Sequence, residues 1–228
     1  MGHAAEALPE VQTQAPRHSD ASKALSLGER AATVRSPCFW PALPGKRPLS
    51  QIERAGLLRL SDSIPGACSD EETVALIEAM RHAPTGDVVE IGSGCGRTAV
   101  LLAWLARRYQ IGAVLCVDAW SEEAATDFEI AVAPLADGRL NRLQTSEASG
   151  YGPGFRIATK TFGETCYEGQ LALLHASCAD CVEPWIGRMA PGGWIVTSGE
   201  GDVLGDARRE RVSASFVAGG SRFVQLKR

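Results

Sequence analysis

The sequence predicts an α/β protein with a doubly wound, mostly parallel seven-stranded sheet that ends in an antiparallel β-hairpin. Three observations predict this fold class. From residue 87 onward, short apolar runs alternate with helical patterns, which is typical of a parallel sheet covered by helices on both faces. A glycine-rich turn follows the first apolar run. The last two alternating runs are joined by Gly219-Gly220, a dipeptide that favours the type I′ turn of a hairpin.

The individual elements follow from local patterns. Ser69, with Glu72 three residues later, has the spacing of a capping box, so we expect a helix to begin there. The parallel strands are predicted at the apolar runs 87–92, 113–120, 139–146, 171–177 and 192–198. Helices are predicted at 97–110, in an interrupted pattern over 121–136, and around 182–190.

Three parts of the chain differ in composition. Residues 1–36 are rich in Ala, Ser, Gln, Glu and Pro and show little periodicity, so we expect a mobile or loosely docked N-terminal tail. Residues 37–68 begin with a proline-rich stretch and are expected to form an N-terminal extension that packs on the core. Residues 69–228 are expected to form the main domain.

Composition narrows the possible functions. The chain has 228 residues, of which 45% are hydrophobic, and a formal net charge of −4, which argues against binding nucleic acid through its phosphates. No apolar run approaches the roughly 20 residues needed to cross a bilayer, and the N-terminus lacks the pattern of a secretory signal. The seven cysteines show no framework spacing, so we expect reduced thiols in a cytoplasmic protein.

The turn after the first strand indicates a cofactor. Glu90, Gly92, Gly94 and Gly96 form an acid-x-Gly-x-Gly-x-Gly motif. In the dinucleotide-binding motif the third glycine falls one position later, where this chain has Arg97. A carboxylate just before the glycines would repel a pyrophosphate, whereas it suits the cationic amino end of S-adenosylmethionine (SAM). The motif therefore favours SAM, although a glycine-rich turn on its own is often purely structural.

A second acid supports the same cofactor. Asp118 ends the second predicted strand and can accept hydrogen bonds from both ribose hydroxyls. Ala119 and Trp120 follow it and are placed to flank the adenine. Taken alone, an aspartate at a strand end is often a helix cap.

Several segments then point to one family: "EIGSGCGRTAVLLA", "VLCVDAW", "LALLH", "MAPGGWIV" and "FVAGGSRFVQL". From about Ser69 to Arg228 the chain resembles class I SAM-dependent methyltransferases, which have a Rossmann-like sheet. Among them it resembles methyltransferase family 24, a group of natural-product O-methyltransferases. The resemblance implies SAM binding by Glu90, the three glycines of the motif and Asp118. By its position after the third strand, Ser146 is implied to reach the adenine.

The chain departs from the family pattern where many relatives bind a divalent metal. In those relatives, acids after the fourth and fifth strands hold the ion, which binds the substrate's hydroxyls. Here Thr197, Ser198 and Gly199 stand where paired acids would be, and the segment after His175 is shorter. We therefore expect no metal site.

His175 is the candidate catalytic residue. It ends the fourth predicted strand, at the edge of the sheet where such folds bind ligands, and it could take a proton from a substrate hydroxyl as general base. A strand-end histidine bonded to a backbone carbonyl is an equally good interpretation. Asp180, Glu200 and Asp202 lie in adjoining loops and are more often caps or solvated acids than catalytic groups.

His175, Cys178 and Cys181 form His-x-x-Cys-x-x-Cys. This spacing is compatible with three zinc ligands, and Cys-x-x-Cys also occurs in redox pairs. No second Cys/His pair stands nearby, and the thioredoxin-like context of redox pairs is missing. We favour two small apolar residues, one helical turn apart, that pack inward.

The glycine-rich segment 147–170 is long for a connection between strands and is placed to close over a substrate. Candidate pocket-wall residues in it, with surface packing an equal alternative, are Tyr151, Phe155, Phe162 and Tyr167. The chain lacks the Asp/Asn-Pro-Pro-aromatic motif of enzymes that methylate amino groups of nucleic acids. With the negative charge, this favours a small-molecule acceptor and no nucleic-acid or membrane partner.

The leading hypothesis is a metal-independent, SAM-dependent methyltransferase that acts on a small molecule, on a hydroxyl rather than an amine, with His175 as base. A homo-oligomer is possible. The alternative is a non-catalytic SAM-binding paralogue with a regulatory or partner-binding role. A divergent metal-dependent O-methyltransferase is third.

Overall fold

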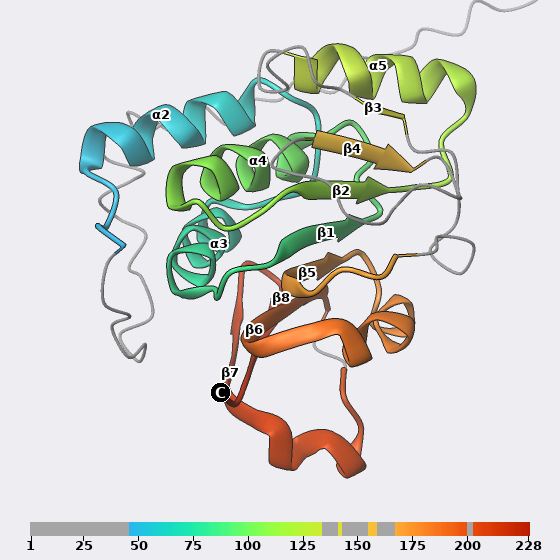
Figure 1. Ribbon diagram of the computed structural model, residues 1–228. Helices are drawn as coiled ribbons and strands as arrows, with labels where there is room; N and C mark the ends of the chain where they lie inside the picture. Colours follow the sequence, from blue (N-terminus) through green and yellow to red (C-terminus); the bar gives the residue numbers. More distant parts are fainter. Residues whose placement is uncertain (1–45, 134–140, 143–154, 159–166, 200–202) are drawn as a thin grey trace, which may run out of the picture.

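The computed structural model describes residues 46–133, 141–142, 155–158, 167–199 and 203–228. The strands in these ranges form one sheet with the order β3-β4-β2-β1-β5-β6-β8-β7 (Figure 1). The strands are β1 (Asp87–Ile91), β2 (Val114–Val117), β3 (Asn141–Arg142), β4 (Phe155–Ala158), β5 (Leu171–Ala176), β6 (Met189–Ser198), β7 (Val212–Ala218) and β8 (Ser221–Leu226).

The sheet is parallel from β3 to β6, and β8 runs antiparallel between β6 and β7. The predicted doubly wound sheet with a terminal hairpin is therefore confirmed. Gly219 and Gly220, which join β7 and β8, have φ of +60° and +82°. Both values lie in the left-handed region that a type I′ turn requires at its two central positions.

The described residues contain eight strands rather than the predicted seven, and the difference lies at one edge. Within the predicted third strand, 139–146, the described residues are those of β3, at the outer edge of the sheet. The strand that pairs with β2 is β4, which lies within the segment predicted to be a loop. Strand β4 has four residues and follows a glycine-rich stretch. So short a segment shows no alternating pattern, so this strand could not be predicted from the sequence.

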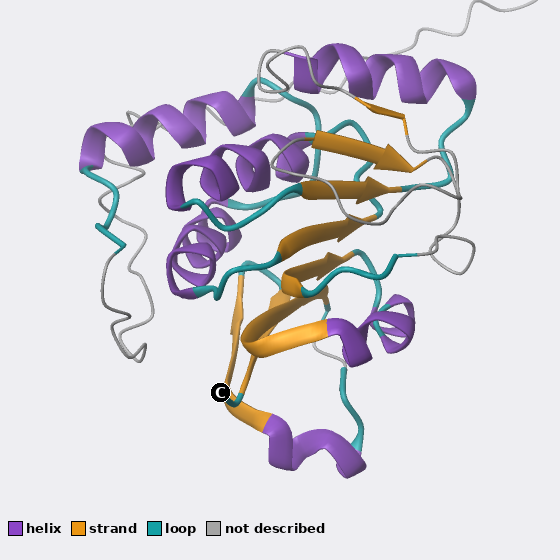
Figure 2. Cartoon of the chain, in the orientation of Figure 1, coloured by secondary structure: helices purple, strands orange, loops and turns teal. Residues whose placement is uncertain are grey.

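In the described ranges, α-helices precede or alternate with the strands: α2 (Gln51–Asp62), α3 (Asp70–His82), α4 (Arg97–Tyr109) and α5 (Glu122–Val132). Figure 2 shows α2, α3 and α4 to one side of the sheet. Helix α2 lies in the predicted N-terminal extension but was not predicted as a helix. It begins with a complete capping box between Ser50 and Glu53, and Leu57 joins it to the core.

In place of the predicted helix around 182–190, short 3₁₀ segments precede β6. These are η3 (Ala179–Cys181) and η4 (Glu183–Arg188), and a third, η5 (Asp206–Arg211), precedes the hairpin. Pro184 sits in the first turn of η4, as expected from its missing N–H.

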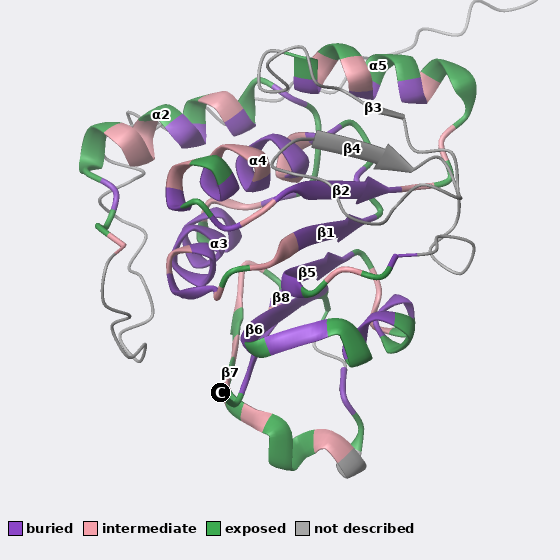
Figure 3. Ribbon diagram, viewed as in Figure 1, coloured by how far each residue is buried: buried purple, intermediate pink, exposed green. Residues whose placement is uncertain are grey.

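The core has one apolar layer on each face of the sheet. Helices α2 to α5 cover one face, and Trp185 and Ile186 of η4 help to cover the other. Every residue of β5 is buried (Figure 3), as expected for an interior strand of a parallel sheet. Polar side chains on such a strand need polar partners inside the protein, and β5 carries one, His175.

Candidate functional site

The glycine-rich turn between β1 and α4 has a different use for each glycine. All three have positive φ: 81° at Gly92, 53° at Gly94 and 93° at Gly96. A Cβ on Gly92 would lie 2.3 Å from Ser177 Oγ, and one on Gly96 would lie 3.1 Å from the ring of Phe128. Space is open where a Cβ on Gly94 would project. Gly92 and Gly96 therefore leave room for side chains of the protein itself, whereas the exposed Gly94 leaves room for a ligand.

Asp118 and Trp120 meet this turn at Gly94. Asp118 Oδ2 accepts a hydrogen bond from Gly94 N–H at 2.8 Å, and its Oδ1 accepts one from Ala119 N–H at 2.7 Å. Trp120 Nε1 donates to Gly94 O, also at 2.8 Å. The predicted cofactor residues of both strand ends thus lie together at one edge of the sheet. Ribose hydroxyls bound by Asp118 would compete with the Gly94 N–H for its oxygens.

Glu90, the acid of the motif, points into the protein. It is 1% exposed, and its Oε1 lies 3.8 Å from His175 Nδ1. Cys116 Sγ donates a weak hydrogen bond to Oε2 at 3.7 Å. Burial raises the pKa of Glu90, and the charge of His175 counteracts only part of that rise. Because Glu90 and His175 are paired in register on β1 and β5, their side chains share one face.

Glu72 of α3 completes this cluster and was not predicted as a site residue. The prediction of a capping box is half right: Ser69 Oγ accepts from Glu72 N–H at 3.1 Å. The Glu72 side chain does not return to the cap, because its Oε1 accepts from Ser221 Oγ at 2.8 Å and lies 3.4 Å from His175 Nε2. Only the tertiary fold brings Glu72 and Ser221 to His175, so no local sequence pattern could have indicated these contacts.

Two opposing effects act on the Glu72 carboxyl. Burial raises its pKa, but the hydrogen bond and charge of His175, together with Ser221, outweigh burial and hold the pKa below its usual range. Glu72 is thus favoured as a carboxylate.

His175 has carboxyl groups on both sides. Its side chain is 9% exposed, Nε2 faces Glu72, and Nδ1 faces Glu90 without a hydrogen bond to any described residue. The partner that the structure gives Nε2 is a carboxylate rather than the backbone carbonyl considered from the sequence. A proton on Nε2 would be stabilised by Glu72, which leaves Nδ1 as the acceptor atom of the ring.

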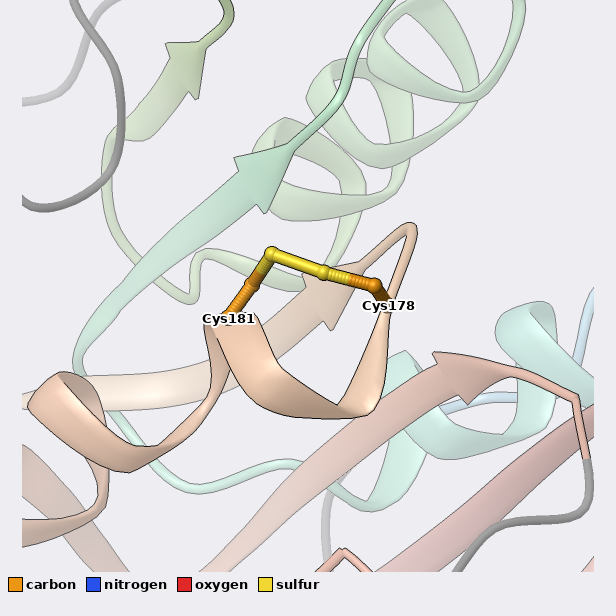
Figure 4. Close-up of a disulfide and its surroundings, with 2 residues drawn as sticks. All are labelled: Cys178 and Cys181. Atoms are coloured by element: carbon orange, nitrogen blue, oxygen red, sulfur yellow. A yellow bond between two sulfur atoms is a disulfide. The ribbon is translucent and has the colours of Figure 1, made fainter.

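Cys178 and Cys181 form a disulfide across the η3 turn (Figure 4). The expectation of reduced thiols is therefore wrong for this pair, because the turn brings the two Cα atoms to 5.6 Å, within bonding range. With its sulfurs bonded to each other, the pair offers no thiolates to zinc. The free cysteines of the described ranges are Cys68, Cys95 and Cys116.

Tyr167 does not line the site. Its hydroxyl donates to Asp87 at the amino end of β1, whereas Glu90 and the glycines are at the carboxyl end. The ring is buried against Trp185, 6.0 Å between centroids. This corrects the predicted pocket wall at that residue. Asp180 is exposed on η3. The remaining predicted site or wall residues lie outside the described side chains: Ser146, Tyr151, Phe155, Phe162, Glu200 and Asp202.

No protein-family model matches the sequence, and no curated protein matches it. Among solved structures, the ribosomal protein L11 methylase of Lactobacillus delbrueckii subsp. bulgaricus is 17% identical, with a TM-score of 0.45 over 69% of this chain and 79% of its own. An O-methyltransferase of Bacillus cereus in complex with SAH is 16% identical, with a TM-score of 0.46 over 76% and 90%.

A SAM-dependent O-methyltransferase of Thermotoga maritima is 12% identical, with a TM-score of 0.49 over 69% of this chain and 65% of its own. Because these identities and scores are low, the function of this chain has to follow from its own residues. Within the described ranges, no helix has the length and apolar character needed to span a membrane.

Proposed function

We propose that this chain is a SAM-dependent methyltransferase that acts on a small molecule, at a hydroxyl rather than an amine, without a metal ion. The observation that carries the proposal is the contact between the two predicted cofactor motifs. Asp118 bonds directly to Gly94 N–H, and the open space above Gly94 lies beside it. An acid at the end of β2 next to an accessible glycine turn suits a ribose, and the buried acid Glu90 suits an ammonium group.

Different residues are proposed to bind different parts of SAM. Asp118 holds the ribose hydroxyls, Ala119, Trp120 and Ser146 border the adenine, and Glu90 with the glycine turn receives the methionine end. When bound, SAM supplies a methyl group on a sulfonium, which is already a good leaving group. The chain therefore has to align the acceptor and exclude water more than to activate the methyl donor.

His175 is the proposed base for a hydroxyl acceptor. Its position at the end of β5 and the Glu72 carboxylate on its Nε2 support this role, with Nδ1 taking the proton. Thr197 and Ser198 at the end of β6 provide hydroxyls where a metal-binding relative has acids, which supports metal independence. We place the protein in the cytoplasm, as a soluble enzyme with no nucleic-acid or membrane partner and a possible homo-oligomeric form.

One observation favours the second candidate, a SAM-binding protein without methyl transfer. Both ring nitrogens of His175 are directed at buried carboxyl groups, and Nδ1 is shielded from solvent. An imidazole held in this way can be a structural link between Glu72 and Glu90. Methyl transfer to any acceptor decides between the two.

Titration calorimetry with SAM tests the cofactor. We expect binding by the wild-type chain and a loss of about tenfold or more in affinity for Asp118→Asn, which replaces one carboxylate oxygen with an amide nitrogen that cannot accept from a hydroxyl. Asp127→Asn, an exposed acid on α5, is the matched control and should bind SAM like wild type. If the wild-type chain is folded and calorimetry detects no SAM binding, the proposed function is wrong.

If SAM binds, release of S-adenosylhomocysteine is followed with a panel of small hydroxylated and amino compounds, with and without EDTA. Turnover that EDTA does not affect supports the metal-independent enzyme. Turnover abolished by EDTA would make the metal-dependent reading correct, and the absence of turnover with every acceptor would favour the non-catalytic alternative.

A further inference from the structure

The Cys178–Cys181 disulfide begins one residue after Ser177, which lies against Gly92 of the glycine-rich turn 92–96, called the cofactor turn below. Cys178 follows Ser177, the first residue after β5, and Cys181 ends the η3 turn (Figure 4). The two sulfur-bearing residues differ in access: Cys178 is half-buried, whereas Cys181 is buried in the apolar layer with Val182 and Trp185. The bond therefore ties a partly accessible residue at the sheet edge to an anchored one.

Ser177 connects this pair to the cofactor turn. Its N–H donates to Ile91 O at 2.9 Å, which extends the pairing of β5 with β1 by one residue. Its side chain occupies the space that a Cβ on Gly92 would need, with Oγ 2.3 Å from that position. The position of Ser177, which precedes Cys178 in the chain, therefore restricts the space at Gly92, the first glycine of the motif.

Buried side chains anchor the end of the turn that the disulfide closes, but the backbone of this turn has little hydrogen bonding of its own among the described residues. The backbone bond described across it runs from Val182 N–H to Ala179 O at 3.1 Å, and a single 3₁₀ turn has poor intrinsic stability. A disulfide that spans so few residues restricts the unfolded chain much less than one that closes a long loop. Its main effect is therefore expected to be local order in segment 177–182 rather than global stability.

Two of the three other described thiols are poorly suited to exchange with the pair. Burial raises the pKa of Cys68 to about 12 and that of Cys116 well above its usual value, so both remain protonated and unreactive. Cys95 on the glycine turn is exposed and has a free thiol, so it is the described cysteine that is available to compete with the pair. Among the described cysteines, Cys178 and Cys181 are the two that are bonded to each other, and Cys178 is the more accessible of them.

We propose that Cys178 and Cys181 are a redox-active pair that exchanges with low-molecular-weight thiols, and that its oxidised form holds Ser177 against the cofactor turn. In reduction, a small thiolate attacks Cys178 Sγ, the S–S bond breaks, and the Cys181 thiolate leaves and takes up a proton. A second small thiolate attacks the mixed disulfide and releases Cys178 as a thiol. Two small thiols become one small disulfide, and the protein pair gains two electrons and two protons.

The first test needs no cofactor. The full chain is equilibrated in a series of glutathione buffers that differ in the ratio of oxidised to reduced glutathione, and is then alkylated. The mass of the peptide that contains Cys178 and Cys181 is measured by mass spectrometry. We expect one reversible transition between a disulfide and two alkylated thiols. A pair that stays bonded in the most reducing buffer, or stays open in the most oxidising one, overturns the proposal.

Hydrogen exchange measures the local effect. Peptides covering residues 171–182 are expected to exchange at least several-fold faster in the reduced protein, because the N–H groups of Ser177 and Val182 lose their support. The double variant with Cys178→Ser and Cys181→Ser should exchange like the reduced protein and should not respond to the buffer. Equal exchange in both redox states of the wild type would contradict the assigned role.

The link to the cofactor rests on the proposed SAM binding. The oxidised chain is expected to bind SAM about tenfold more tightly than the reduced chain, because less ordering remains to be done on binding. The double variant should show one affinity in both buffers. Equal affinities of the two wild-type states overturn the link. If neither state binds SAM, the proposed function fails, whereas alkylation and hydrogen exchange still decide whether the pair is redox-active.

Discussion

Glu72 joins two segments that follow it far along the chain, with Ser221 at a separation of 149 residues and His175 at 103. Its carboxylate is buried, accepts one hydrogen bond from a hydroxyl and faces an imidazole. A buried charge is tolerated only where such partners compensate the lost water. The cost of removing it is therefore expected to depend on whether the carboxyl is ionised.

Glu72→Gln is expected to lower the free energy of unfolding at pH 7 by about 1–3 kcal/mol, the usual effect of removing a charged partner from a buried hydrogen bond. Because the folded-state pKa of Glu72 is lowered, the wild-type advantage is present above the ordinary glutamate pKa of 4.5 and is lost as the pH falls through the lower folded value. Urea unfolding at pH 7 and at several values below 4.5 measures this.

The neighbouring acid provides the control for that experiment. Glu71 lies in the same first turn of α3 but is exposed, so Glu71→Gln should change stability by less than about 0.5 kcal/mol. An equal and pH-independent loss in both variants would show that the Glu72 contacts with His175 and Ser221 contribute nothing.

Among the elements, the β7–β8 hairpin has a role beyond closing the sheet. A Cβ on Gly219 would lie 2.1 Å from Ser69 Oγ and 2.7 Å from Glu72 N, so the hairpin turn packs on the first turn of α3. The same hairpin supplies Ser221 to Glu72. Its position thus supports one of the partners that keep the acid buried.

Substitutions at Gly219 and Gly220 distinguish the packing of the hairpin on α3 from the backbone geometry of the turn itself. Both have positive φ, so alanine at either position is expected to cost about 1–2 kcal/mol in backbone strain. Space is open at Gly220, whereas Gly219 would collide with α3. Gly219→Ala should therefore be less stable than Gly220→Ala by a further 1–3 kcal/mol or so, the typical cost of overpacking, in thermal or urea unfolding. Equal losses would mean that the turn does not press on the helix.

The elements also show what local patterns can predict. The hairpin was predicted because two glycines between alternating runs specify their own turn, and the β1–α4 turn because its glycines are regularly spaced. Strand β4 was missed because its identity depends on pairing with β2, which four residues do not reveal. Helix α2 begins with a capping box, Ser50 and Glu53, whose spacing is a local pattern that indicates a helix start.

Across the whole molecule, the candidate site combines parts that differ in how far the sequence can place them. The glycines, Asp118 and Trp120 are close in the chain to the strand ends that position them, and in the structure Asp118 and Trp120 both bond to Gly94. The cluster of Glu72, Glu90 and His175 depends on the packing of α3 against β1 and β5. That packing is set by the apolar layer over the whole sheet face, so it becomes visible only in the fold.

This cluster puts two carboxyl groups with opposite responses to pH into one apolar layer. The pKa of Glu72 is lowered, so its ionised form stabilises the fold, whereas burial raises the pKa of Glu90, so its neutral form does. Stability contributed by the neutral Glu90 is present below the ordinary pKa of 4.5 and is lost as the pH rises through the higher folded value. At neutral pH, Glu90 therefore weakens the fold.

Glu90→Gln should remove that cost, because an amide stays neutral at every pH. We expect the variant to equal wild type near pH 4 and to exceed its free energy of unfolding by about 1 kcal/mol at pH 8, measured by urea unfolding. The same variant should bind SAM at least tenfold more weakly in calorimetry, since the ammonium loses its carboxylate. A variant less stable than wild type at pH 8 would mean that the electrostatic attraction to His175, 3.8 Å away, outweighs burial. Unchanged SAM affinity would remove Glu90 from the cofactor site.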